Sequence, residues 1–303
     1  MTPDVAASVR ARLLRKAKER GEEFELFLVR YAVESFLYRL GASPWRVRCV
    51  LKGAALLTLW MEDPYRSSRD VDLLATGPGD EAGIRALVTE VCALPCPEDG
   101  LRFDVDTLAV APIHDDDGTG GQRAVLIAYL GKARMRVQID CGFGDAVSPA
   151  PEESEYPTLL DTLPAPAVRT YPRVVSIAEK FDAMVTLGRR NSRMKDFHDV
   201  WALSGAFSFR GAILREAIDT CFARRGTRWT AEIPDSLTPS FYQDDALRAR
   251  WSAYLRTGAL RVVPPARFEE IGERVREFLL PVRESIVGDA RFEVSWAPGG
   301  PWE

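Results

Sequence analysis

The stretch "SSRDVDLLATG" (67–77) decides how this chain is read, because it places two carboxylates among apolar residues. In a β-strand alternate side chains share a face, so Asp70 and Asp72 point the same way, roughly 6.5 Å apart along the backbone. Two such carboxylates repel each other unless a cation lies between them, and Mg²⁺ prefers hard oxygen ligands. The stretch is therefore either an ordinary strand end that meets solvent or a site for divalent metal.

A third carboxylate, Asp140, ends the apolar stretch "MRVQID" further along the chain. If that strand neighbours residues 69–75, three carboxylates meet at one edge of a sheet. Such a cluster fits two-metal phosphoryl or nucleotidyl transfer, in which ions ~4 Å apart stabilise the attacking and leaving oxygens. The spacing alone is a weak signal, since "FDVDTL" carries a second Asp-x-Asp pair, Asp104 and Asp106, with no phosphate-binding pattern nearby.

The residues around the first pair favour a phosphate site. The Gly53 turn in "KGAALL" opens a predicted helix, and a helix start offers free backbone N–H groups and a positive dipole end. Lys52, Ser68 and Arg66 add further donors. The alternative is that the turn serves packing alone.

Composition indicates a globular protein that does not enter a membrane. The chain has 303 residues, 46% hydrophobic and 28% charged, which suits one large domain or two modest ones. No apolar run approaches the ~18 residues of a membrane span, and the N-terminus lacks the apolar core of a signal peptide. The five cysteines and two histidines form no zinc-ligand pattern, since Cys92 and Cys96 are a half-site without a second half. We expect a reduced, cytoplasmic protein.

The net charge of −4 argues against non-specific coating of nucleic acid, which depends on neutralising phosphates. The charge is segregated, however. Residues 1–20 carry six basic and two acidic side chains, a local +4, and residues 76–117 carry ten acidic and two basic ones, a local −8. This distribution permits a local basic footprint, although two differently solvated faces explain it equally well.

The periodicity predicts an α+β fold: a mixed sheet backed by helices over residues 1–165, followed by a mostly helical half over residues 166–303. Six prolines and little periodicity predict a linker over residues 146–173. The predicted strands are 46–53, 69–75, 101–113, 122–131 and 133–143, and the predicted helices are 2–20, 22–43, 54–61, 78–94, 174–188, 194–205, 209–224, 243–257 and 266–283.

Four motifs, taken in order, resemble the AbiEii/AbiGii-type nucleotidyltransferase family, toxins of type IV toxin–antitoxin and abortive-infection systems. The first is "VLKGAALLTLW" followed by "YRSSRDVDLL". The others are "VQIDCGFGDAVSP" (137–149), "IAEKFDAMVTLGRRNSRMKDFHDVWALS" (177–204) and "SLTPSFYQDDALRARWSAYLR" (236–256). The resemblance covers residues 30–285.

The resemblance implies a DNA polymerase β-like nucleotidyltransferase fold in the first domain and a helical second domain that completes the active-site cleft. It implies transfer of a nucleotide from an NTP, with Mg²⁺ or Mn²⁺, to an acceptor such as RNA, with a tRNA 3′ end as the first candidate. The partner it implies is an antitoxin that acts without a stable complex.

Carried over by position, Asp70 and Asp72 are similar to the family's metal-binding pair, and Asp140 stands where a third carboxylate is expected. Lys180 resembles the helical lysine that faces the triphosphate, and Asp196 resembles the acidic residue of the Lys-Asp motif. The phosphate-side candidates are Lys52, Gly53, Ser68, Arg66 and Arg193.

Two positions depart from the family pattern. Ala54 stands where the family usually has a second glycine, so the turn survives unless that position requires a positive φ. His198 stands where the family usually has an aromatic residue, and we interpret it as a packing substitute rather than a general base. The basic turn 188–196 and the segment "ARRGTRW" (223–229) are candidate sites for triphosphate or RNA, although such charge runs are usually solvated.

The leading hypothesis is a metal-dependent nucleotidyltransferase with an RNA acceptor. A second keeps the chemistry and changes the acceptor to a protein side chain or a small molecule. A third is an inactive nucleotide- or RNA-binding module that kept the fold, and the intact set Asp70, Asp72, Lys180 and Asp196 argues against it. For Lys180 alone, the alternative is an ordinary surface lysine whose stem lies along apolar neighbours.

Overall fold

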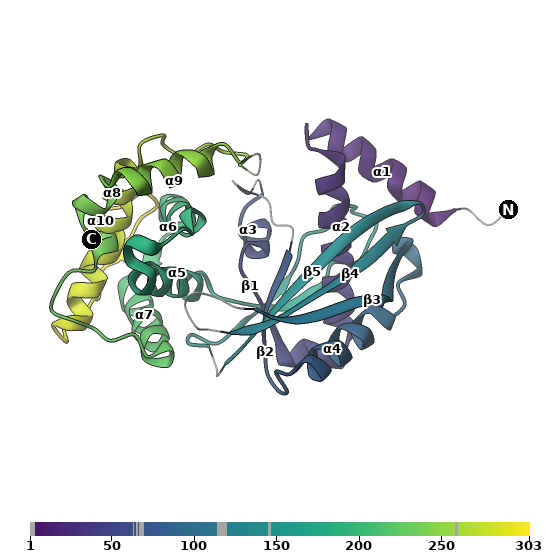
Figure 1. Cartoon of the computed structure of the whole chain (residues 1–303), viewed down its shortest axis with the longest axis horizontal. Helices are drawn as coiled ribbons and strands as arrows, with labels where there is room; N and C mark the ends of the chain where they lie inside the picture. Colours follow the sequence, from purple (N-terminus) through teal and green to yellow (C-terminus); the bar gives the residue numbers. More distant parts are fainter. Residues whose placement is uncertain are drawn as a thin grey trace. The chain divides into compact units, whose positions relative to one another are not determined.

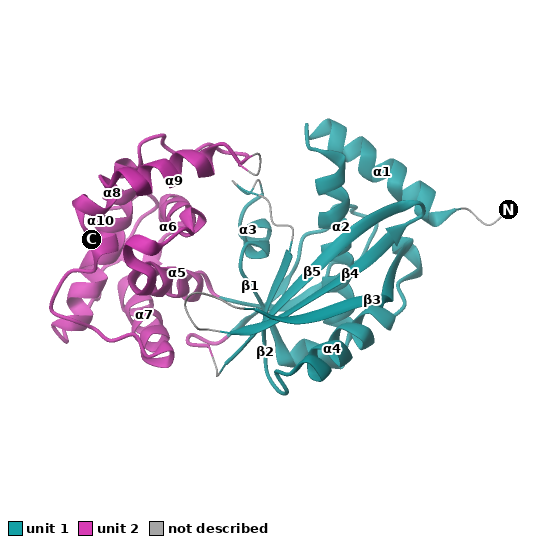
Figure 2. Cartoon of the chain, in the orientation of Figure 1, with its two compact units in different colours: residues 1–146, 151–171 teal, residues 147–150, 172–303 magenta. Residues whose placement is uncertain are grey.

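The computed structural model of the chain describes residues 4–62, 64, 66, 70–113, 120–144, 147–257 and 260–303. The chain forms two compact units, one of residues 1–146 and 151–171 and the other of residues 147–150 and 172–303 (Figure 2). The first unit combines a sheet with helices and the second is mainly helical, so the predicted α+β fold is confirmed. The main part of the second unit begins at Pro172, a few residues after the boundary predicted at 165.

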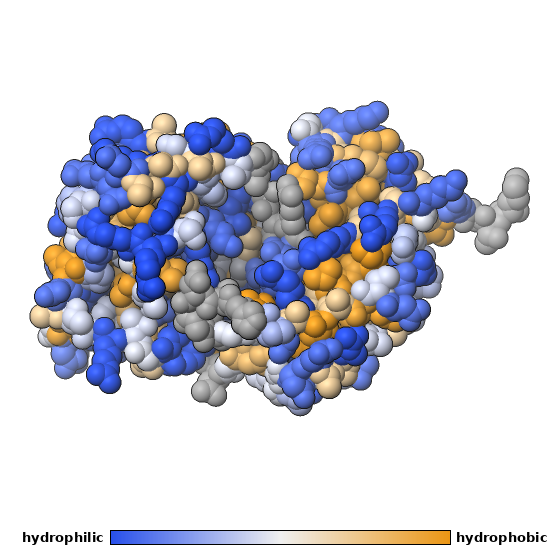
Figure 3. Space-filling model, viewed as in Figure 1, coloured by the Kyte–Doolittle hydropathy of each residue, from blue (hydrophilic) through white to orange (hydrophobic). Residues whose placement is uncertain are grey.

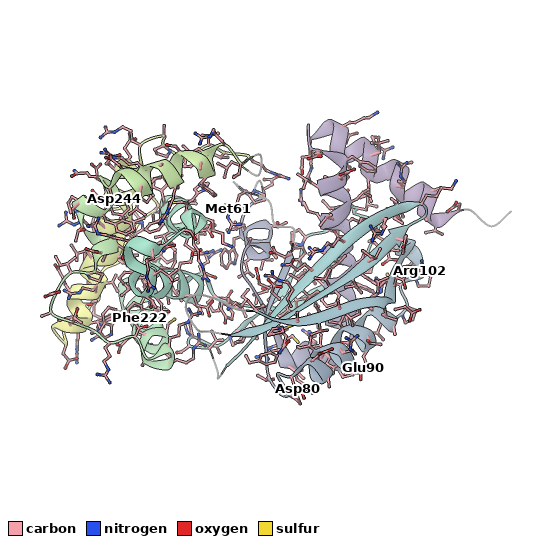
Figure 4. All side chains as sticks on the ribbon, in the orientation of Figure 1. Met61, Asp80, Glu90, Arg102, Phe222 and Asp244 are labelled. Atoms are coloured by element: carbon pink, nitrogen blue, oxygen red, sulfur yellow. The ribbon has the colours of Figure 1, made fainter. Side chains whose placement is uncertain are left out.

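Aspartates begin two helices of the first unit. The Asp4 carboxylate accepts a hydrogen bond from the N–H of Ala7, and Asp80, labelled in Figure 4, accepts one from the N–H of Gly83. The elements of this unit are α1 (Val5–Glu19), α2 (Phe24–Ala42), η1 (Pro44–Arg48), β1 (Cys49–Lys52), α3 (Ala55–Trp60), β2 (Asp70–Ala75), α4 (Glu81–Ala93), η2 (Pro97–Asp99), β3 (Leu101–Ile113), β4 (Gly121–Leu130), β5 (Ala133–Phe143), β6 (Glu152–Glu155) and β7 (Ala167–Thr170).

The seven strands form one mixed sheet in the order β3-β4-β5-β2-β1-β7-β6 (Figure 1). β4 and β5 form a hairpin, and Gly131 in its turn has a φ of +58°. β2 lies at the centre of the sheet, parallel to β5 and antiparallel to β1. Residues 70–75 therefore neighbour the strand that carries Asp140, which is the condition under which three carboxylates meet.

One face of this sheet is buried beneath helices α2 and α4. Alternate residues of β4 and β5 point to this face, and Leu126 and Val137 are 0% exposed there. Phe36 of α2 packs edge-on against Phe103 of β3, with ring centroids 6.3 Å apart. The helices thus hold the strands from one side, and the intervening strand residues point to the other.

The predicted linker over residues 146–173 is wrong for two short stretches, because β6 and β7 lie within it. Both extend the sheet at one edge: β7 pairs in parallel with β1, and β6 pairs antiparallel with β7. The sequence did not predict these strands because prolines lie close to them. Pro donates no hydrogen bond to a β-ladder, but it is tolerated at edge strands. The sequence of β6, "EESE", also has low β propensity.

The five helices predicted in the second unit are present, while the short helix α8 and the pair β8–β9 were not predicted. The helix predicted from 209 begins at Gly211, because Phe209 and Arg210 pair with the C-terminal strand. Asp244, labelled in Figure 4, caps α9 by accepting from Ala246 and Leu247. The elements are α5 (Arg173–Leu187), η3 (Gly188–Arg190), α6 (Met194–Ala206), β8 (Phe209–Arg210), α7 (Gly211–Arg225), η4 (Asp235–Leu237), α8 (Pro239–Tyr242), α9 (Asp245–Leu255), α10 (Phe268–Val287) and β9 (Ser295–Trp296).

Among the residues described, no helix combines the length and the apolar character needed to cross a bilayer.

Candidate active site

Three carboxylates converge on the sheet face that points away from α2 and α4. Asp70 and Asp72 are alternate residues of β2, and the strand register aligns Asp72 with Asp140 of β5. All three side chains are half-buried, and one oxygen of each lies within 4.8 Å of the others. Val71 between the first two is 0% exposed, because it points to the opposite, buried face. The structure thus brings together the carboxylates that the sequence singled out.

Gly53 makes room for the Asp72 carboxylate. Its φ is +70°, a left-handed conformation that favours glycine, and a Cβ at this position would lie 2.6 Å from Cγ of Asp72. Ordinary van der Waals contact begins at 3.4 Å, so only glycine allows this approach. The next residue, Ala54, has a φ of −71°, so the alanine that departs from the family pattern fits this turn without strain.

A row of four charged side chains crosses the sheet at this point. The registers align Lys52 of β1 with Asp72, Asp72 with Asp140, and Asp140 with Arg123 of β4. The two central carboxylates are therefore flanked by a cation on each side. Lys52 Nζ also lies 5.5 Å from the ring centroid of Tyr171. This arrangement offsets part of the repulsion between the carboxylates.

Arg123 and Gln138 hold Asp140 in place. Arg123 donates from Nε and Nη2 to the two oxygens of Asp140, at 2.8 and 2.7 Å, and Gln138 Nε2 donates to the same carboxylate at 3.2 Å. Such a bidentate pair fixes the plane of the carboxylate. The sequence interpretation missed both residues. The signal was present, because the tight turn after residue 130 sets a hairpin register that places 123 opposite 140.

The donor set fits a hard divalent cation. Three carboxylates offer the oxygen ligands that Mg²⁺ and Mn²⁺ prefer, and no thiol or imidazole belongs to the cluster. Within the described ranges, this is the one group of three or more acidic, histidine or cysteine residues close enough to share an ion. The second Asp-x-Asp pair does not join it. Asp104 lies on β3, the outermost strand, where it pairs with Ile127 of β4, and Asp106 is exposed.

In the helical unit, Lys180 is part of a buried ion cluster. Its Nζ lies 3.2 Å from Oδ1 of Asp196 and 2.5 Å from Oδ2 of Asp199. The side chains of the lysine and of these aspartates are 17%, 8% and 1% exposed. Lys180 is therefore not an ordinary surface lysine. Asp199, the second aspartate of the Lys-Asp-x-x-Asp motif, was missed as a site residue, although it lies one helical turn after Asp196.

The remaining predicted residues have different surroundings. Ser68 lies outside the described residues, and Arg66 is half-buried. Arg193 precedes α6, and its backbone N–H donates to the buried Asn191 at 2.7 Å. His198 is 0% exposed, and its Nδ1 lies 2.8 Å from the hydroxyl of Tyr254. That burial among aromatic rings fits the interpretation of His198 as a packing residue.

In the segment 223–229, one face of the Trp229 ring is covered by Phe222 and is closed to a stacking base. The two rings stack with centroids 4.1 Å apart and planes 6° apart, and the indole N–H donates to Asp219. Arg225 is paired with Asp182 at 3.1 Å. These contacts assign the segment to the packing between α7 and α5, which disfavours it as an acceptor site (Figure 4 labels Phe222).

The sequence match decides the family. The model of the AbiEii nucleotidyltransferase toxins of type IV toxin–antitoxin systems matches residues 35–274. The chain belongs to this family. As an AbiEii-family protein it is a nucleotidyltransferase of the toxin type. No curated protein matches the chain significantly.

A solved structure with a similar fold is that of the MenT4 toxin. The nucleotidyltransferase toxin MenT4 from Mycobacterium tuberculosis is 22% identical, with a TM-score of 0.58, and the match covers 89% of each chain. Two Helicobacter pylori proteins, one of them JHP933, are 15% identical, with TM-scores of 0.49 and 0.48. Their matches cover 89% and 88% of this chain and 99% and 95% of theirs.

Proposed function

We propose that this AbiEii-family chain transfers a nucleoside monophosphate from an NTP to an RNA, with the 3′ end of a tRNA as the first acceptor to test. The convergence of Asp70, Asp72 and Asp140 carries the proposal. In this reaction an acceptor hydroxyl forms a bond to the α-phosphorus, the bond from that phosphorus to the bridging oxygen breaks, and pyrophosphate leaves. Catalysis of such a transfer consists mainly of positioning and charge neutralisation, which a few well-held charges supply.

In the first unit, Asp70 and Asp72 would hold Mg²⁺ or Mn²⁺, and Asp140 would bind metal or orient the attacking hydroxyl. The bound ion would supply charge neutralisation at the transferring phosphoryl group. Arg123 keeps Asp140 in one orientation, and Gly53 lets Asp72 reach the cluster. Both therefore act as positioning residues.

Cations and hydrogen-bond donors close to these carboxylates in the sequence would bind the phosphates of the NTP. Lys52, in the same row of side chains as Asp72, would neutralise phosphate charge. The same role is proposed for Gly53 and Arg66 from their place near the acidic pair in the sequence, and for Arg193 from the basic turn 188–196. The resemblance adds Ser68.

The helical unit contributes Lys180 and Asp196 to the proposed reaction. Lys180 would neutralise the triphosphate, as the family resemblance implies. The ion pairs to Asp196 and Asp199 would orient the ammonium group and limit the freedom of its long stem. In this assignment Asp196 and Asp199 position the lysine.

The proposal includes a cognate antitoxin that acts without a stable complex, and a cytoplasmic location. The described cysteines are all free, which is the usual state in a reducing compartment.

The test is incubation of the purified chain with each labelled NTP, Mg²⁺ and separate pools of RNA, protein and small molecules. We expect label on RNA, with tRNA as the main labelled species. Label confined to protein or to small molecules would replace RNA by another acceptor. Absence of label from every pool under all four NTPs would contradict transferase activity.

A further inference from the structure

The sheet face that carries the acidic cluster continues far beyond it. On β5 the alternate residues Met135, Val137 and Ile139 are buried, so the residues between them point to the opposite face. Figure 1 shows β3, β4 and β5 on this side of the unit, and the same view in Figure 3 shows hydrophilic surface crossing an apolar area over these strands. The side chains of β5 that share the face are, in order from the cluster, Asp140, Gln138, Arg136 and Arg134.

Hydrogen bonds connect this row of side chains to the cluster. Arg136 Nη1 donates to Oε1 of Gln138 at 3.1 Å, and Gln138 Nε2 donates to Oδ2 of Asp140 at 3.2 Å. Arg134 follows two residues further along the strand and is exposed. At about 3.3 Å per residue, the row runs roughly 20 Å from Asp140 to Arg134. One continuous surface therefore leads away from the proposed reaction centre.

The far end of the row carries an aromatic ring between two arginines. The registers align Arg134 with Tyr129 of β4, and Tyr129 with Arg102 of β3. The guanidinium carbon of Arg102 lies 4.7 Å from the Tyr129 ring centroid, and the Arg102 side chain is 65% exposed (Figure 4 labels Arg102). Asp104, 3.8 Å from Arg102, offsets one of these positive charges. Among the described residues, Arg134 forms no ion pair.

This chemistry fits an unpaired RNA strand. Exposed arginines pair with backbone phosphates, and aromatic rings and guanidinium planes stack on bases. In RNA-binding domains a sheet platform with aromatic side chains holds about two or three bases. The half-buried Tyr129, with the Arg102 guanidinium over its ring, supplies one ring for such stacking. A duplex fits less well, because its bases are already stacked on one another and cannot stack on a side chain of the platform. A protein partner without acidic groups would leave the arginines unpaired.

We propose that the platform formed by Arg102, Tyr129, Arg134 and Arg136 binds the single-stranded end of the acceptor RNA. The terminal hydroxyl lies at the acidic cluster, and the preceding nucleotides follow β5 and β4 toward Tyr129. This inference rests on the proposed function for the direction of the strand, while the binding itself is measurable without any transfer.

The test measures binding of a fluorescein-labelled, 12-nucleotide single-stranded RNA by anisotropy, without NTP or divalent metal. Arg134→Ala combined with Arg136→Ala should weaken binding about ten-fold and reduce the slope of log K against log[salt] by about 1.4, since each phosphate contact contributes about 0.7. The matched control is Arg210→Ala combined with Arg291→Ala, two exposed arginines of the other unit, which should bind RNA as the wild type does.

Stacking is tested separately at Tyr129. Tyr129→Ala should weaken binding about ten-fold, whereas Tyr129→Phe should retain it, because the ring and not the hydroxyl stacks. Circular dichroism and the thermal midpoint of each variant confirm that it is folded.

Two outcomes overturn the platform: wild-type affinity in the folded Arg134/Arg136 variant, or equal loss in the Arg210/Arg291 control. Tighter binding of an acidic peptide than of RNA at the same four residues would also overturn it in favour of a protein partner. A different result tests the proposed function. If the wild-type chain binds RNA through this platform but labels no RNA, the proposed transfer is contradicted and the platform is not.

Discussion

Gly53→Ala should displace the Asp72 carboxylate and so lower the transfer rate far more than it lowers the stability of the fold. A Cβ at residue 53 would lie 2.6 Å from Cγ of Asp72, where ordinary contact begins at 3.4 Å, so the carboxylate must move by about 1 Å. A misplacement of that size in an active site costs up to about 100-fold in rate. The left-handed φ of +70° adds a cost of about 1–2 kcal/mol for any residue with a Cβ.

Gly21→Ala is the matched control. Gly21 has a φ of +64°, and a Cβ at residue 21 would have no heavy atom within 4 Å. The only loss of stability in this variant is therefore that of placing a residue with a Cβ in a left-handed conformation. A cost of about 1 kcal/mol lowers the thermal midpoint by about 2–4 °C in a unit of this size. Initial rates of labelled-NMP transfer and thermal unfolding are measured on both variants.

The two variants should differ in activity far more than in stability. Gly21→Ala should keep nearly full transfer activity, and Gly53→Ala should lose about 100-fold. If Gly53→Ala retains wild-type transfer while its thermal midpoint falls as in Gly21→Ala, the close approach of residue 53 to Asp72 has no role in catalysis.

Three further predictions concern other described residues. Burial raises the pKa of Glu34 from 4.5 to about 8, so the stabilising contribution of this residue is complete below pH 4.5 and decreases as the pH rises toward 8. Urea unfolding of the wild type should show the free energy of unfolding fall by about 3–5 kcal/mol across that range, and Glu34→Gln should make this fall smaller. An unchanged pH profile in the variant would refute the assignment. Arg123→Gln should lower the transfer rate about ten-fold by releasing Asp140, with little change in the KM for NTP; a rise in KM alone would show that the arginine binds substrate instead. Asp199→Asn should cost about 3 kcal/mol in unfolding free energy, because Lys180 loses its shorter ion pair in a buried site, and a loss below about 0.5 kcal/mol would show that the pair is solvated.

The local elements of this chain could largely be predicted from the sequence. β3 and β5 match their predicted ranges, because clear alternation of apolar residues sets their bounds. β6 could not be recognised, since its pairing with β7 depends on contacts between segments and not on the propensity of "EESE".

The acidic cluster was predictable only as a possibility. Alternation places Asp70 and Asp72 on one face, but the approach of Asp140 depends on the pairing of β2 with β5, which spacing does not determine. The same limitation explains why Asp199 was overlooked: its partner, Lys180, comes from another helix. Local patterns indicate which face a side chain occupies, and tertiary pairing decides what it meets there.

The most direct test of the central claim compares two Asp-x-Asp pairs in one assay of metal-dependent NMP transfer to total RNA. Asp70→Asn and Asp72→Asn remove single charges from the cluster, and Asp106→Asn makes the same change in the second pair on β3. The account predicts that either substitution on β2 lowers transfer at least about 1,000-fold while the Asp106 variant remains near wild type. Wild-type transfer by folded Asp70→Asn and Asp72→Asn proteins would contradict it.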